Sequence, residues 1–169
     1  MISLNRFFKN FGLLEILVLS SLSYVIIMLL WTASTRSAVE EKANLIKSNH
    51  KKVLNFINEQ INICDQNENG STVWGDLCNE NWSSQKIVKY ILKNSNLSNP
   101  YSISKDLIQS SEDPRIQAEG KAGQSTDKGI IFVSSNNFES EAGSEWVVGT
   151  CIKSPCVAAG NNELVSVYR

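Results

Sequence analysis

Residues 11–31 form an almost unbroken apolar run, and this run limits what the chain can be more than any other feature. A helix over these residues would be roughly 30 Å long, enough to cross the hydrocarbon core of a bilayer. Arg6 and Lys9 precede the run, so the positive-inside rule places the N-terminus in the cytoplasm. Trp31 stands where an interfacial aromatic ring is expected. The run therefore predicts one membrane-spanning helix.

A cleaved secretory signal is the alternative interpretation of the same run. The apolar region of a signal peptide usually has about 7–15 residues, and this run is longer. Ala33 and Ala38 are small residues that could still offer a cleavage site. A secreted protein would then begin after about Ala33 or Ala38.

Glu15 is the one acidic side chain within the run. A charge near the bilayer centre costs about 2.5–3.5 kcal/mol, and less near the start of the helix. One interpretation is that Glu15 is protonated or reaches the headgroups. The other is that it pairs with a positive group on a neighbouring chain. Gly12, Ser20 and Ser23 lie roughly on its side of the helix and would suit helix–helix packing in lipid.

Residues 32–64 contain no proline or glycine and predict a helix that continues the spanning segment. Their apolar side chains recur at spacings of three and four, which marks one helix face. We expect this face to pack on the protein's own domain, and a coiled-coil stalk is the alternative. We expect His50, which fills one step of the series, to be solvated or half-buried. The apolar members are Val39, Ala43, Ile46, Val53, Ile57 and Ile61.

Four cysteines all follow the hydrophobic run. An even number on one side of a membrane anchor suggests two disulfides and an oxidising, extracytoplasmic compartment. Cys64 and Cys78 could close the polar loop of residues 65–82, and Cys151 and Cys156 could join a strand to the following turn.

Residues 65–169 predict a small α+β domain. Residues 83–92 favour a short helix that Ser83 or Ser84 caps, with Ile87, Val88, Ile91 and Leu92 on one face. Residues 94–128 are expected to be mostly loop, with a candidate short helix over 105–110. Three segments rich in β-branched and aromatic residues suit an antiparallel meander. These strands are expected at 129–134, 145–152 and 164–168.

Known catalytic patterns are missing, so we predict neither an enzyme nor a metal or cofactor site. The sequence has one histidine, no nucleophile elbow, no zinc spacing of cysteines and no glycine-rich phosphate loop. Glu112 and Asp113 fall in a polar loop, where we expect them to be solvated. The 16 basic and 17 acidic residues give a net charge of -1, which does not indicate a nucleic-acid partner.

Residues 6–30 resemble the N-terminus of type IV pilins and of the related pseudopilins of type II secretion. The resemblance lies in a short basic leader, residues 1–10, followed by Phe11-Gly-Leu-Leu-Glu15 and about sixteen apolar residues. It implies that a prepilin peptidase cuts between Asn10 and Phe11 and that Phe11 is then N-methylated. Asn10 stands where the family nearly always has glycine.

The resemblance also implies an architecture and an assembly mechanism. The expected fold is a pilin-like long helix, apolar over 11–31 and amphipathic over 32–64, packed on a small antiparallel sheet. The chain would wait in the inner membrane and then enter a filament, at the cell surface or in the periplasm, beside like or unlike subunits. Glu15 would neutralise the amine of Phe11 on an adjacent subunit, which fixes register. Membrane lipid, the peptidase and the inner-membrane assembly machinery are the expected partners.

Two other functions fit the same anchor. One is a single-span protein with a periplasmic binding or sensory domain, which keeps Met1. The other is a secreted protein whose signal is removed. The first residue of the mature chain separates all three.

Overall fold

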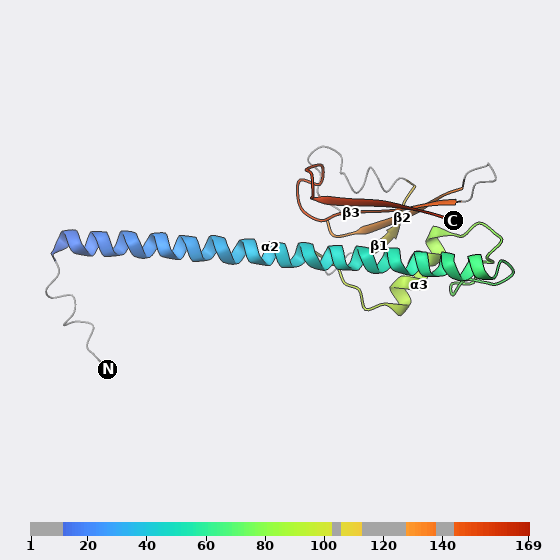
Figure 1. Ribbon diagram of the computed structural model, residues 1–169. Coiled ribbons are helices and arrows are strands. Elements are labelled where there is room, and N and C mark those ends of the chain that lie inside the picture. The colour runs from blue at the N-terminus through green and yellow to red at the C-terminus, as the bar shows by residue number, and fades with distance from the viewer. Residues whose placement is uncertain (1–11, 103–105, 113–127, 138–143) are drawn as a thin grey trace. The chain divides into compact units, whose positions relative to one another are not determined.

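The computed structural model describes residues 12–102, 106–112, 128–137 and 144–169. The chain divides into two compact units, Met1–Glu41 and Lys42–Arg169. Figure 1 shows the elements, in which α2 belongs to both units and the others to the second. They are α2 (Leu13–Gln66), α3 (Ser84–Asn94), β1 (Ile108–Ser110), β2 (Ile131–Asn137), β3 (Ser144–Cys151) and β4 (Asn162–Tyr168).

The first unit contains the beginning of α2, and all its described residues, 12–41, are exposed. The most apolar stretch of the helix has a mean hydropathy of 2.4, and none of it is buried. The helix is therefore long and apolar enough to cross a membrane, as the sequence predicted.

In the second unit, α2 buries one face from Ala43 onwards. The buried apolar side chains follow the predicted spacing of three and four residues. Val39 departs from the prediction, because it lies before the second unit begins and is exposed. The buried residues of the face are Ala43, Ile46, Asn49, His50, Val53, Leu54, Ile57, Gln60, Ile61 and Cys64.

The sheet has the strand order β1-β2-β3-β4. Strands β2, β3 and β4 form the predicted antiparallel meander, in which Val133 pairs with Val148 and Val148 with Val165. Strand β1 was not predicted, and it pairs in parallel with β2, so the sheet is mixed. The candidate helix over 105–110 is wrong for residues 108–110. Three residues carry too little pattern, and pairing with the distant β2 decides their conformation.

Helix α3 confirms the predicted short helix and extends it to Asn94. Ser83 is the N-cap, and its side chain accepts a hydrogen bond from the backbone of Lys86. Ile87, Val88 and Ile91 are buried, but Leu92 is 39% exposed and does not belong to the buried face.

One hydrophobic core joins α2, α3 and one face of the sheet. Trp82 and Trp146, with ring centroids 6.0 Å apart, are its largest fully buried side chains. Two disulfides, Cys64–Cys78 and Cys151–Cys156, confirm both suggested pairings. The α+β fold, a long and initially apolar helix packed on a small sheet, is as predicted.

Candidate functional site

The exposed apolar segment of α2 is the first candidate site. Its large side chains, from Leu13 to Trp31, are between 41% and 81% exposed. Burying one such side chain is worth about 1.5–3 kcal/mol, so a surface of this size would not stay in contact with water. Contact with lipid or with the apolar helices of other chains would remove this surface from water.

Five serine and threonine hydroxyl groups in this part of α2 are already satisfied within the helix. Their oxygens donate to backbone carbonyls three or four residues earlier, at 2.8 to 3.1 Å. A hydroxyl that is bonded in this way does not need water, which suits an apolar environment. The residues concerned are Ser20, Ser21, Ser23, Thr32 and Thr35.

Glu15 lies in the first turn of α2 and caps it. The backbone N–H of Gly12 donates to Oε2 of Glu15 at 2.8 Å, which is one half of a capping box. The carboxylate also lies at the positive end of the helix dipole. Asn10 and Phe11, the predicted cleavage and methylation residues, lie outside the described residues.

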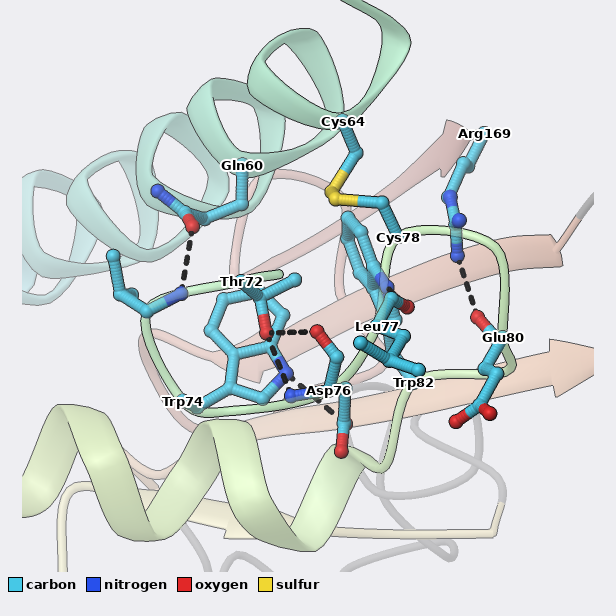
Figure 2. Close-up of a disulfide and its surroundings, with 11 residues drawn as sticks. Gln60, Cys64, Thr72, Trp74, Asp76, Leu77, Cys78, Glu80, Trp82 and Arg169 are labelled. Carbon is cyan, nitrogen blue, oxygen red and sulfur yellow. Dashed lines mark hydrogen bonds between the residues drawn. A yellow bond between two sulfur atoms is a disulfide. The ribbon is translucent and has the colours of Figure 1, made fainter. Parts of the chain in front are cut away.

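The second candidate site is the loop that the Cys64–Cys78 disulfide closes, which we call the disulfide loop (Figure 2). The disulfide ties it to the end of α2, and Gln60 on α2 accepts a hydrogen bond from the backbone N–H of Val73 at 3.1 Å. Thr72 and Asp76 exchange hydrogen bonds between side chain and backbone at 3.0 Å. The loop is therefore fixed by contacts along its whole length.

Asp76 is the centre of this arrangement and is 6% exposed. Its Oδ2 accepts from Trp74 Nε1 at 3.1 Å and from the backbone N–H of Ser83 at 2.8 Å. Its Oδ1 accepts from the ammonium group of Lys86 on α3. Burial alone would raise the pKa of Asp76, but the bonds from Lys86, Ser83 and Trp74 outweigh it and lower the pKa. Asp76 is therefore a carboxylate that joins the loop to α3.

Arg169 contacts the residues that directly follow the disulfide loop, as Figure 2 shows. Its guanidinium group donates to the backbone carbonyl of Glu80 at 2.9 Å and lies 4.2 Å from the ring of Trp82. Trp82 in turn donates from Nε1 to the carbonyl of Leu77 at 3.2 Å. The C-terminal residue of the sequence thus stabilises a loop some ninety residues earlier.

Around this fixed loop lies a surface that we call the loop surface. Its apolar part is formed by side chains that are 43% to 50% exposed, and its polar part carries three exposed carboxylates. Apolar side chains on a fixed loop lose little conformational entropy when a contact buries them. The apolar members are Val73 and Leu77, and the acidic members are Asp65, Glu68 and Glu80.

A hollow of about 310 Å³ lies between α2 and α3. Phe56 and Tyr90 line it, with stacked rings whose centroids are 5.8 Å apart. Lys52 stands at its rim, and no ion pair involves this lysine within the described residues. On the other flank of α3 a second, more open hollow is lined by Leu92 together with Lys89 and Lys93. Apolar walls with basic rims therefore flank α3.

His50 corrects the expectation of a solvated or half-buried position, because its ring is fully buried. Its Nε2 lies 3.2 Å from the carbonyl oxygen of Val148 on β3, and Nδ1 lies 3.1 Å from Oε2 of Glu163 on β4. Burial lowers the pKa of His50, and these two oxygen atoms offset part of that effect. The apolar spacing of its helix face was the signal that could have found it.

Acidification is expected to destabilise the second unit through His50. The folded pKa is lowered, so between that value and about 6.5 the unfolded chain binds more protons. The free energy of unfolding should fall as the pH decreases through this window and be unaffected by His50 above it. Denaturation of the full chain in detergent at pH 7.5 and 5.5 measures this. His50→Gln should show a smaller difference between the two pH values, and an equal difference would contradict the assignment.

Two loop carboxylates considered in the sequence are Glu112 and Asp113. Glu112 is exposed, as expected, and Asp113 lies outside the described residues. No group of three potential metal ligands occurs among the residues that the structure describes. Comparison of the chain with protein-family models, with curated proteins and with solved structures found no match.

Proposed function

We propose that the chain is a structural subunit of a filament of the type IV pilus or pseudopilus kind. The observation that carries the proposal is the exposed apolar beginning of α2, in which Glu15 is the only charged residue between Gly12 and Thr35. An anchor that only needs to cross a bilayer does not require a carboxylate in its first turn, where a charge adds to the cost of insertion. A helix that moves from lipid into a bundle of identical helices can use such a group to set its stagger.

The capping contact of Glu15 fits this function. In the separate chain the carboxylate accepts from the backbone N–H of Gly12, so it has a partner before assembly. On assembly it exchanges this neutral donor for the amine of Phe11 on an adjacent subunit. In the contact with Gly12 only the carboxylate is charged, whereas both partners are charged in the new contact, so the exchange favours the correctly staggered filament.

The N-terminus of the mature chain tests the proposal. Mass spectrometry of the protein from its own host is expected to find a chain that begins at Phe11 and carries one additional methyl group. An intact Met1 would instead favour a membrane-anchored binding or sensory domain. A start after Ala33 or Ala38 would favour a secreted protein, and either result would overturn the filament proposal.

Replacement of Glu15 is expected to separate membrane insertion from assembly. Glu15→Ala should leave the chain in the membrane fraction and reduce the filament fraction at least about tenfold, because register loses its charged pair. Glu15→Gln is the matched variant, since it keeps a capping acceptor for Gly12 but no charge. If Glu15→Gln assembles like the unchanged chain, the carboxylate acts only as a helix cap.

A further inference from the structure

We propose that the loop surface of one chain binds the flanks of α3 on a second copy of the same chain. The proposal rests on the filament function above and names the contact between the second units that such a filament would contain. We call the receiving side the α3 surface. It consists of α3 with its two flanking hollows and the lysines at their rims, Lys52, Lys89 and Lys93.

Charge complementarity is the first argument. Helix α3 carries three lysines and no acidic residue, and Lys86 is the one that Asp76 engages. Lys89 and Lys93 are exposed and form no ion pair within the described residues. The loop surface offers three exposed carboxylates, and Arg169 donates to the carbonyl of Glu80 and interacts electrostatically with Asp65. Opposite charges at the rim of an interface guide association and fix register.

Apolar complementarity is the second argument. Val73 is 50% exposed and Leu77 is 43% exposed, although both belong to a loop that is fixed by hydrogen bonds and a disulfide. The hollow beside α3 has aromatic and aliphatic walls that include Phe56 and Tyr90. Apolar groups that are already held in place lose little conformational entropy on binding. The loop surface therefore has the properties expected of a group that enters a hollow, and the hollow beside α3 has the properties expected of the site that accepts it.

The symmetry of the contact points to a second copy as the partner. The two surfaces differ in chemistry, and each chain carries one of each. A contact between unlike patches leaves one free patch at each end of a pair, so further copies can add without limit. Such a heterologous contact produces an open helical assembly when the rotation between copies does not close a ring, and this is what a filament subunit needs.

Photo-crosslinking of the full chain in proteoliposomes tests the contact. Para-benzoyl-phenylalanine in place of Leu92, which is 39% exposed on α3, should crosslink to residues 65–80 of a second copy, as peptide mass spectrometry can establish. The same probe at Val157, which is 58% exposed outside both surfaces, is the control and should give no such crosslink. Crosslinks from position 92 to lipid, to other segments or to nothing would overturn the proposal.

Charge reversal provides the second arm. Lys89→Glu with Lys93→Glu should lower the yield of crosslinked pairs about three- to tenfold, because two rim pairs become repulsive. Glu68→Lys with Asp65→Lys should do the same, and the four changes together should restore the yield. The matched control is Lys47→Glu with Lys51→Glu on α2, which should leave it unchanged. Failure of the combined variant to recover would overturn the pairing of these two surfaces.

The outcomes separate this inference from the filament proposal. A correct crosslink from a chain that keeps Met1 would support the contact and overturn the filament function. Filaments whose crosslinks join other segments would support the function and overturn the contact. A retained Met1 together with no crosslink would overturn both.

Discussion

Asp76→Ala is expected to lower the free energy of unfolding of the second unit by about 2–4 kcal/mol. The change removes a buried acceptor and leaves three donors, on Trp74, Ser83 and Lys86, without their partner. A buried donor that loses its acceptor costs about 1–3 kcal/mol, and Lys86 can turn to water whereas the other two donors are partly enclosed. Denaturant unfolding of the full chain in detergent, followed by tryptophan fluorescence, measures the effect.

Two further variants, Asp76→Asn and Asp106→Ala, should lower the free energy of unfolding by smaller amounts. Asp76→Asn keeps the shape and one carbonyl acceptor but loses the charge that Lys86 pairs with, so about 1–2 kcal/mol is expected. Asp106→Ala removes an exposed carboxylate and should change the free energy by less than about 0.5 kcal/mol. If Asp76→Ala costs no more than Asp106→Ala, the contacts of Asp76 do not hold the loop.

Asp76→Ala should weaken association between copies by more than the loss of folded protein alone would explain. Asp76 joins the disulfide loop to α3, so both surfaces of the proposed contact depend on it. The change should therefore reduce crosslinking between copies even under conditions where the second unit remains folded. Pre-organisation of the loop, rather than a direct contact with the partner, is the reason for this expectation.

The parts of the fold that depend on local pattern could be predicted from the sequence. The apolar run, the period of three and four along α2 and the β-branched segments of β2, β3 and β4 all specify their element without distant partners. The disulfide pairings also agreed with the suggestion from the sequence, because each pair is separated by a short loop.

The parts that depend on distant partners could not be predicted. Strand β1 forms because Ile108 and its neighbours pair with β2, and no pattern in three residues specifies this. The oxygen atoms that face the ring nitrogens of His50 lie on β3 and β4, about a hundred residues later in the sequence. Arg169 reaches the disulfide loop across a similar separation. A single sequence does not show which distant residues are in contact. The two proposed contact surfaces could therefore be identified only from the structure.

Removal of the Cys64–Cys78 disulfide is the second change with a large expected effect. The cysteines are separated by 14 residues, and closing a loop of this length is worth about 3 kcal/mol in the chain-entropy model. The double variant Cys64→Ala with Cys78→Ala should therefore lower the free energy of unfolding by about this amount. Both sulfur atoms are buried, so the smaller alanine side chains add a modest packing loss.

The other disulfide of the chain is a built-in control. Cys151 and Cys156 are separated by only 5 residues, for which the same model gives about 2 kcal/mol. Their double alanine variant should be the milder one in unfolding experiments. It should also leave crosslinking from position 92 unchanged wherever the second unit stays folded, because neither cysteine belongs to the loop surface or the α3 surface.

Comparison of the two double alanine variants shows whether the Cys64–Cys78 disulfide only stabilises the fold or also holds the loop surface in the arrangement that association needs. Without the bond from Cys64 to Cys78, the disulfide loop keeps the Gln60 contact and the bonds of Asp76, but its closing point is free. Val73 and Leu77 would then sample several arrangements, and ordering them on binding would weaken association between copies. Loss of crosslinking in this variant alone, in a folded chain, is the expected result. Equal loss in both variants would mean that the disulfides act only through stability, and no loss in either would mean that the loop surface does not need to be rigid.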